Sequence, residues 1–226
     1  MINYVDRSTV ELIQTNASDD LVCMAAWVSF DQDKAERLKN EKGKAGLINF
    51  LLKNKHNSPF EHGQFTFRVT TPLFVRSEHH RHRTQAYNEV SGRYTKYDME
   101  FYLPANTRPL QQEGKAGAYS FVAGTNEQYA VMQASHRRVI ETAVEEYHRQ
   151  LDFGIAKEVA RMVLPPSLMT KYYATVNPRN LMAFLELRTD PTALHEIRDV
   201  ANQMEDIFKD TMPLTYNAWK DNQWLL

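Results

Sequence analysis

The sequence predicts an α+β fold in a single domain over residues 1–226, with a mostly antiparallel sheet packed with helices. Phe65, Phe67 and Val69 alternate with polar residues, which indicates a half-buried strand. Apolar residues at helical spacing over 129–151 indicate one long amphipathic helix. A chain of 226 residues can bury a sizeable core, and no internal repeat or linker divides it.

The composition is that of a globular protein, and it limits the classes of partner. Hydrophobic residues make up 42% of the chain and the net charge is −1, whereas a dedicated nucleic-acid binder is expected to be basic overall. The one cysteine, Cys23, lies in an apolar run and is expected to be buried rather than nucleophilic. A single cysteine allows no internal disulfide, which fits a reducing compartment. No apolar run approaches about 20 residues and no signal peptide is apparent, so we expect a cytoplasmic protein without a membrane or nucleic-acid partner.

The N-terminal quarter of the chain is expected to combine extended segments with two helices. Residues 2–15 are expected to be extended, with the clearest strand pattern at 9–13. An apolar run predicts a largely buried helix over 19–28, and helical spacing predicts an amphipathic helix over about 43–54. The polar segment 31–44 is expected to be helical in part.

The segment around Pro59 is expected to form a turn, and the strand that follows it is expected to lead into a helix. Thr71 suits the N-cap of that helix, and Pro72 suits its first position. This helix is expected to carry the charged residues that follow. If Arg81 and Arg83 are both helical, they point about 200° apart, since each residue turns by about 100°. We therefore expect these two arginines to serve different ligands or different subunits.

The second half of the chain contains clear helix start and stop signals. Residues 125–128 form a capping box before the long helix, and Gly154 is expected to end it. Asn177 is expected to cap a later helix that begins at Pro178, which makes that helix N-terminus a suitable anion site. Before the long helix we expect a loop at 89–93, a strand at 97–103 and an irregular surface excursion at 104–124. After it we expect a short helix at 155–164, a strand at 168–176 and the helix that follows Asn177. A final helix is expected at 192–209, followed by an aromatic tail that contains Trp219 and Trp224.

The stretch from His79 to Tyr94 concentrates more hydrogen-bonding capacity than any other part of the sequence. It contains three arginines, three histidines, a carboxylate and a serine-glycine turn. Arginine offers a planar charged fork that suits phosphate, and glycine lets the backbone approach a ligand closely. The stretch is therefore typical of a polyanion site with a recognition loop. These residues alone allow two other interpretations. One is a solvated helix face, and the other is a metal site formed by His79 and His82, which His56 and His62 could join.

The full pattern is Arg81-His82-Arg83, seven residues, and then Ser91-Gly92-Arg93, and it resembles the signature of the flavin-dependent thymidylate synthases. Further segments that resemble this family occur in the same order: Val28-Ser29-Phe30, His56-Asn57-Ser58-Pro59-Phe60-Glu61-His62, Arg161-Met162-Val163-Leu164-Pro165, and Asn177-Pro178-Arg179 followed by Leu187-Arg188. The resemblance runs from about residue 20 to about residue 215.

The resemblance implies a methyltransferase that converts dUMP to dTMP in thymidylate biosynthesis. It implies methylenetetrahydrofolate as the carbon donor, FAD as the cofactor that carries the reducing equivalents, and NADPH as the reductant that restores them. It also implies a homotetramer with flavin sites shared between subunits. No metal is implied. The folate-dependent thymidylate synthases of the other family use a cysteine nucleophile, and none is apparent here.

Residue roles follow from the resemblance position by position. Arg188 matches the position that stabilises charge on the uracil ring, and is the expected catalytic residue. The expected flavin-binding residues are Ser58, Arg81, His82, Arg83, Glu89, Asn177 and Arg179, with His56 beside the flavin. The expected nucleotide-binding residues are Glu78, Arg81, Glu89, Val90, Ser91, Gly92, Arg93, Arg161 and Arg188. Ser91 is expected to bind rather than to attack, because no base is fixed beside it in the sequence.

The sequence departs from the family pattern at three positions. Glu78 stands where the family carries glutamine, Ala183 where it carries asparagine, and Trp27 where it carries arginine. The alternative functions are a non-catalytic nucleotide or nucleic-acid binding module that uses the Arg/His helix, and a histidine-rich metal hydrolase. Neither accounts for Arg188 or for the Asn177-Pro178-Arg179 cap.

Overall fold

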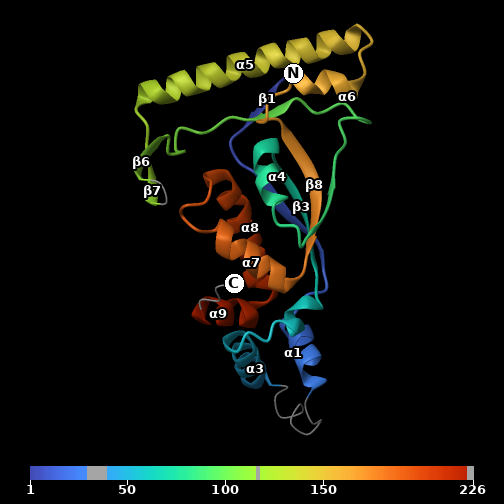
Figure 1. The fold of residues 1–226 in the computed structure, drawn as a ribbon, viewed down its shortest axis with the longest axis vertical. Coiled ribbons are helices and arrows are strands. Elements are labelled where there is room, and N and C mark those ends of the chain that lie inside the picture. The colour runs from blue at the N-terminus through green and yellow to red at the C-terminus, as the bar shows by residue number, and fades with distance from the viewer. Residues whose placement is uncertain (30–39, 116–117, 223–226) are drawn as a thin grey trace.

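The computed structural model describes residues 1–29, 40–115 and 118–222, and its centre is a four-stranded sheet. The strand order is β2 (Thr9–Thr15), β3 (Phe65–Pro72), β8 (Met169–Val176) and β4 (Ala86–Glu89), and each neighbouring pair is antiparallel. Together with the helices around it, this sheet confirms the predicted α+β class (Figure 1).

One face of the sheet forms the main core. Phe65, Phe67 and Val69 of β3 are fully buried, as their alternation with polar residues predicts. Their partners across the ladder are Val176, Ala174 and Tyr172 of β8, so both strands present apolar side chains to the same side. Helices α4 (Leu73–His79), α7 (Pro178–Arg188) and α8 (His195–Thr211) pack with this face in Figure 1.

Three helices close one end of the molecule. Helices α1 (Asp19–Trp27), α3 (Glu41–Lys53) and α9 (Pro213–Asn222) pack against one another below the sheet in Figure 1. Asp19 joins the two ends of the chain, because its carboxylate accepts hydrogen bonds from the backbone N–H groups of Leu214 and Thr215, each at 2.9 Å, and from the Thr215 hydroxyl at 2.6 Å. It thereby caps the start of α9 from a distant part of the sequence.

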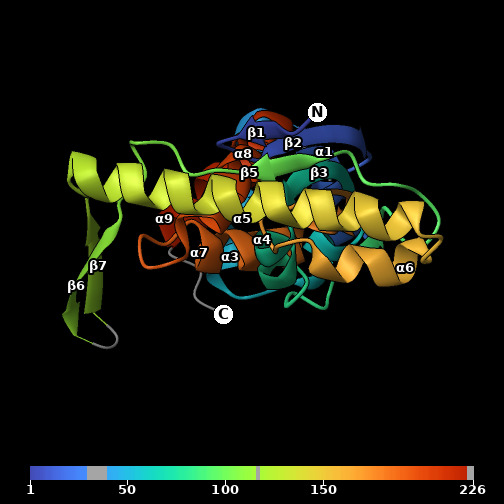
Figure 2. The same cartoon turned by 90° about the horizontal axis from the view of Figure 1, so that it is seen from above.

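The long helix α5 (Asn126–Asp152) lies across the other end (Figures 1 and 2). Its capping box is present as predicted, and Gly154 follows it with a φ of 79°, which favours glycine. Ile140 and Val144 pack with Phe101 and Leu168 in a second, smaller core. Below α5 lie β1 (Asn3–Val5), which pairs in parallel with β5 (Glu100–Tyr102), the short helix α6 (Lys157–Ala160) and the 3₁₀ turn η2 (Arg161–Val163).

Two segments differ from expectation in the second half of the chain. The excursion 104–124 contains a hairpin, β6 (Gln111–Lys115) and β7 (Ala118–Val122), which projects from one end of α5 in Figure 2. Helix α8 is not the final helix, because α9 follows it and buries Trp219. Trp224 lies outside the described residues, as does most of the 31–44 segment.

The helix after β3 begins later and ends earlier than predicted. Thr71 is not its cap, because β3 continues through Pro72 and Thr71 pairs with Thr170. Pro72 occupies the N-cap position, and the helix ends at His79. Residues 80–85 form a turn that leads into β4, whose pairing with β8 overrides the helical reading of this charged stretch. No helix among the described residues is long and apolar enough to cross a membrane.

Candidate functional site

The turn that follows α4 is fixed by a buried histidine. His79 is fully buried, its Nδ1 lies 2.8 Å from the Tyr172 hydroxyl, and its Nε2 lies 3.2 Å from Gln85 Oε1. The amide oxygen only accepts hydrogen bonds, so Nε2 carries the proton and Nδ1 accepts from Tyr172. Burial, and then electrostatic repulsion from His82, lower the pKa of His79 to about 3. A neutral ring stacked on Phe184 therefore anchors the turn to β8 and α7.

Glu78, His82 and Arg188 form one hydrogen-bonded cluster beside this anchor. Arg188 ends α7, and its Nε donates to His82 Nε2 at 3.0 Å while its Nη1 pairs with Glu78 Oε2 at 3.3 Å. Burial, and then the charge of Arg188, lower the pKa of His82 to about 4. His82 is consequently neutral near pH 7 and can accept the hydrogen bond. The structure thus brings together three of the residues that the sequence predicts for the site.

Glu89, at the end of β4, is held by two residues that the sequence analysis did not identify. Thr170 Oγ1 donates to Glu89 Oε1 at 2.7 Å, and Arg76 Nε lies 3.3 Å from the same oxygen. Thr170 belongs to a predicted strand and Arg76 to a predicted helix. No pattern in the sequence showed that these two side chains meet Glu89, because the contact depends on strand pairing and helix packing.

The loop Val90–Arg93 follows directly and is tied to the sheet. The Val90 N–H donates to the Lys171 carbonyl at 3.0 Å, and the Arg93 N–H donates to Ser91 Oγ at 3.3 Å. Gly92 lies against Tyr97, where a Cβ would come within 2.2 Å of the ring. A Cβ at this position would displace the Tyr97 ring or the loop, so glycine permits this close approach.

Arg93 borders a cationic hollow next to this loop. Its Nε pairs with Glu158 Oε2 at 2.9 Å. An open hollow of about 460 Å³ is lined by Arg93, Lys96 and Lys157 and by the carboxylate of Asp152, among others. Three cations and one carboxylate give its border a net positive charge, which suits an anionic group.

A further group of predicted residues lies where α7 begins. Asn177 caps this helix as predicted, through its bond from the Asn180 N–H. Arg179 Nη1 pairs with Glu61 Oε1 at 3.0 Å, whereas its Nε is buried without a hydrogen-bond partner in the described residues. Ser58, in the 3₁₀ turn η1 (Ser58–Glu61), and His56 before it are both exposed. The Asn180 side chain donates to the Thr84 carbonyl at 3.2 Å, which links α7 to the turn after α4.

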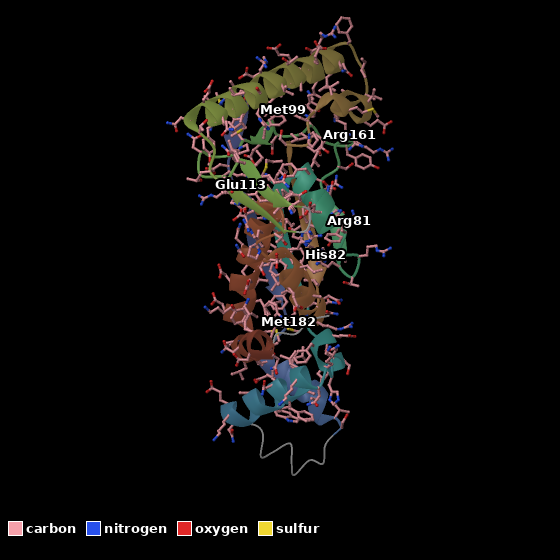
Figure 3. The ribbon with its side chains drawn as sticks, turned by 60° about the vertical axis from the view of Figure 1, so that its left-hand side comes forward. Arg81, His82, Met99, Glu113, Arg161 and Met182 are labelled. Atoms are coloured by element: carbon pink, nitrogen blue, oxygen red, sulfur yellow. The ribbon has the colours of Figure 1, made fainter. Side chains whose placement is uncertain are left out.

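The side chains of the remaining predicted arginines take part in none of these contacts. Arg81 and Arg83 are exposed, and within the described residues neither side chain has a hydrogen bond or an ion pair. Neither residue is helical, so helix geometry does not point the two side chains about 200° apart as predicted. Arg161 lies in η2, and Figure 3 shows it on the same side of the molecule as Arg81 and His82 but closer to α5. No hydrogen bond within the described part of the chain joins Arg161 to the other predicted residues. The predicted residues therefore lie along a stripe from η1, past α4 and α7, to η2.

Among the described residues, no group of three or more histidine, cysteine or acidic residues is placed to hold a metal ion. A polar cavity of about 380 Å³ lies elsewhere, between the β1–β2 connection and the start of α8, and Ser8, Tyr102 and Glu196 line part of it. Its charged residues are of both signs.

Comparisons with known proteins point to one family. The family model described as "Thymidylate synthase complementing protein" matches residues 11–214. The chain is 42% identical to a flavin-dependent thymidylate synthase of Tropheryma whipplei (strain TW08/27), over 96% of this chain and 94% of that protein. It is 43% identical to the enzyme of the same description from Streptomyces avermitilis, over 95% and 91%. The solved structure of the UMP/dUMP methylase PolB from Streptomyces cacaoi, bound with 5-Br dUMP, superimposes with a TM-score of 0.91, 42% identity and 97% coverage of both chains.

Proposed function

The chain belongs to the thymidylate synthase complementing protein family, and on this basis we propose that it is a flavin-dependent methyltransferase that converts dUMP to dTMP. Methylenetetrahydrofolate donates the carbon and NADPH is the reductant. The observation that carries the proposal is the cluster of Glu78, His82 and Arg188. These residues come from two distant segments that both resemble the family, and they meet through direct hydrogen bonds. The whole chain, residues 1–226, acts as one enzyme domain in the cytoplasm.

The residues around η1, the α4 turn and α7 fit a flavin. FAD carries two phosphates, and Arg81 and Arg83 are exposed and unpaired in the described structure. The buried Nε of Arg179 lacks a partner, which a ligand oxygen would supply. The residues proposed to hold the flavin are His56, Ser58, Arg81, His82, Arg83, Glu89, Asn177 and Arg179. When bound, the flavin supplies the reducing equivalents, and the protein supplies orientation and electrostatics.

The loop after β4 fits a nucleotide phosphate. A serine hydroxyl, backbone N–H groups and a guanidinium together offer the donors that phosphate requires. Gly92 keeps this loop close to Tyr97, and Arg93 borders the cationic hollow. The residues proposed to hold dUMP are Glu78, Arg81, Glu89, Val90, Ser91, Gly92, Arg93, Arg161 and Arg188.

Arg188 is the proposed catalytic residue. The difficult step is attack by carbon 5 of uracil, which is a poor nucleophile, and negative charge develops on the ring as it reacts. A fixed guanidinium at the ring edge stabilises that charge more than it stabilises the neutral ring. The contacts to His82 and Glu78 hold the Arg188 guanidinium in one place, so little reorganisation is needed when the charge forms.

The complete site is proposed to lie at subunit interfaces of a homotetramer. Arg161 makes no hydrogen bond with the rest of the predicted stripe among the described residues, so a second copy can bring its own Arg161 to the nucleotide. Apolar side chains beside Arg161 support this assembly, because Val159, Met162 and Val163 are exposed. Such a patch suits coverage by another subunit.

The test is tritium release from 5-tritiated dUMP by the full chain with FAD, NADPH and methylenetetrahydrofolate. We expect release that requires both flavin and reductant. A control with each component omitted in turn distinguishes this reaction from background exchange. Folded protein that binds dUMP and releases no tritium under these conditions would refute the enzyme assignment and favour a non-catalytic nucleotide-binding module.

A further inference from the structure

We propose that Thr170 and Arg76 are positioning residues, which orient the Glu89 carboxylate so that one of its oxygens faces the nucleotide. This inference rests on the proposed function, because Glu89 acts on a ligand only if the site binds one. Neither Thr170 nor Arg76 belongs to the residues that the family resemblance assigns to a ligand. Their role follows from two contacts on one face of the sheet.

The first contact comes from β8. Glu89 pairs with Tyr172 across the β4–β8 ladder, and Thr170 lies two residues before Tyr172. Alternate residues of a strand project to the same side, so Thr170 and Glu89 share a face of the sheet. Thr170 is 1% exposed, and its hydroxyl donates to Glu89 Oε1 at 2.7 Å. Buried on a strand, this hydroxyl is a fixed donor with little freedom to move.

The second contact comes from α4, which covers the same face. His80 on the turn after α4 packs its ring on Tyr87 and Tyr172, which shows how close this segment lies to the sheet. Arg76 of α4 reaches the same carboxylate, with 3.3 Å between its Nε and Glu89 Oε1. Both side chains are partly exposed, so this ion pair alone holds Glu89 weakly.

The Thr170 hydrogen bond and the Arg76 ion pair thus both fall on Oε1 and leave Oε2 without a hydrogen-bond partner in the described residues. An ionised carboxylate has further acceptor capacity, so Oε2 is available to an N–H or O–H group of the nucleotide. Without the Thr170 hydroxyl, the carboxylate is free to turn and pair with the Arg76 guanidinium through both oxygens, as arginine and carboxylate prefer. Oε2 would then be withdrawn from the ligand. The Thr170 hydroxyl therefore determines which Glu89 carboxylate oxygen is available to accept a hydrogen bond from the nucleotide.

The principal test is Thr170→Val, which removes the hydroxyl and keeps the shape of the side chain. We expect the KM for dUMP to rise by about tenfold, the order of one hydrogen bond to a charged group, while kcat stays within about twofold. Thr170→Ser restores the hydroxyl and should return KM to within about twofold of wild type. A purely structural role of Thr170 would not produce this separation of KM from kcat.

The chain offers a matched control on the same strand. Thr175 also lies on β8, is partly buried, and shares a hydrogen bond of 3.0 Å with Thr66. Thr175→Val removes a comparable hydroxyl away from Glu89 and should leave the KM for dUMP unchanged. The thermal unfolding of both valine variants shows whether each is folded at the assay temperature.

Arg76 provides a second, independent arm. If Arg76 and Thr170 act through the same oxygen, Arg76→Gln and Thr170→Val should be non-additive, so that the double variant raises KM by less than the product of the two single effects. If the wild-type protein is active but Thr170→Val and Thr175→Val have equal KM values for dUMP, this inference is overturned and the proposed function stands. Wild type that neither binds dUMP nor releases tritium would overturn the proposed function, and this inference with it.

Discussion

Arg188 donates a hydrogen bond from its Nε to the ring of His82, with 3.0 Å between the two nitrogens. His82 thus uses Nε2 on a neighbouring side chain, and its Nδ1 has no hydrogen-bond partner in the described residues. The arginine closes α7 and the histidine follows α4, so this single contact joins two segments that lie far apart in the sequence. It also gives His82 a role in orienting the proposed catalytic residue.

Replacement of His82 by phenylalanine keeps a ring against Phe184 and removes the acceptor. We expect kcat to fall by at least about tenfold, because Arg188 loses a hydrogen bond worth roughly 1.5–3 kcal/mol. Flavin content, measured from the flavin absorbance of the purified protein, should fall less than kcat. Loss of flavin in proportion to loss of turnover would show that His82 acts on the flavin and not through Arg188.

Removal of the Arg188 side chain tests the catalytic assignment directly. Arg188→Ala should abolish tritium release while most of the flavin stays bound, because the other residues proposed to hold the flavin are unchanged. Arg188→Lys keeps the charge but not the fork that contacts His82 and Glu78 together, so we expect partial activity. Wild-type turnover by Arg188→Ala would refute the assignment.

Arg81 is proposed to contact both the flavin and the nucleotide. Arg81→Ala should weaken the binding of each, which titration calorimetry with FAD and then with dUMP measures. Stability should be unaffected, because this exposed side chain has no partner among the described residues. Arg149→Ala, which removes another exposed arginine from α5, is the control and should change neither affinity. Unaltered affinities for Arg81→Ala would exclude it from the site.

The buried His79 predicts loss of stability in mild acid. Its pKa is lowered to about 3 in the folded protein, whereas the unfolded chain takes up a proton near pH 6.5. Stability is therefore complete above about pH 6.5 and falls as the pH drops toward 3. Between pH 7 and pH 5 the loss is about 2 kcal/mol of unfolding free energy. The lowered pKa of the half-buried His82 adds a further loss over the same range.

Urea unfolding at several pH values measures this effect. His79→Gln should be less stable than wild type at pH 7, because it loses the packing against Phe184, but its stability should vary less between pH 6.5 and pH 5. An equally steep decline in that variant would show that groups other than His79 bind the protons.

Gly92 predicts a steric effect on nucleotide binding. Gly92→Ala places a Cβ where only 2.2 Å separates it from Tyr97, so the loop or the ring must move. We expect a higher KM for dUMP and a lower melting temperature. Gly46 in α3 has no atom within 4 Å of an added Cβ, and Gly46→Ala should keep KM and raise stability by up to about 1 kcal/mol. Equal KM values for dUMP and equal melting temperatures in the two variants would contradict the steric role of Gly92.

Local signals account for the elements that the sequence predicted correctly. The capping box before α5, the Asn177 cap of α7 and the alternation in β3 each depend on residues close together in the chain, so they are visible without a structure. The resemblance that located Glu78, His82 and Arg188 was likewise carried by short motifs. Their meeting in space was not predicted, because it depends on how α4 and α7 pack.

The sequence predictions fail where contacts between distant segments determine the local structure. Residues 86–89 are short and mixed in polarity, and only pairing with β8 makes them a strand. Tyr87 reinforces this geometry, because its hydroxyl donates to the carbonyls of His79 and His82 and so helps to close the end of α4. Arg76 and Thr170 were missed for the same reason. Nothing in the sequence marks them as partners of Glu89.

The contact between Asp19 and the start of α9 has a consequence for synthesis of the protein. The ribosome releases Asp19 long before Leu214 and Thr215, so α1 cannot complete this contact during most of translation. Strand β3 likewise waits for β8, which is made about a hundred residues later. The nascent chain therefore lacks the partners of β3 until its last strand and helices emerge, and we expect folding to be largely post-translational.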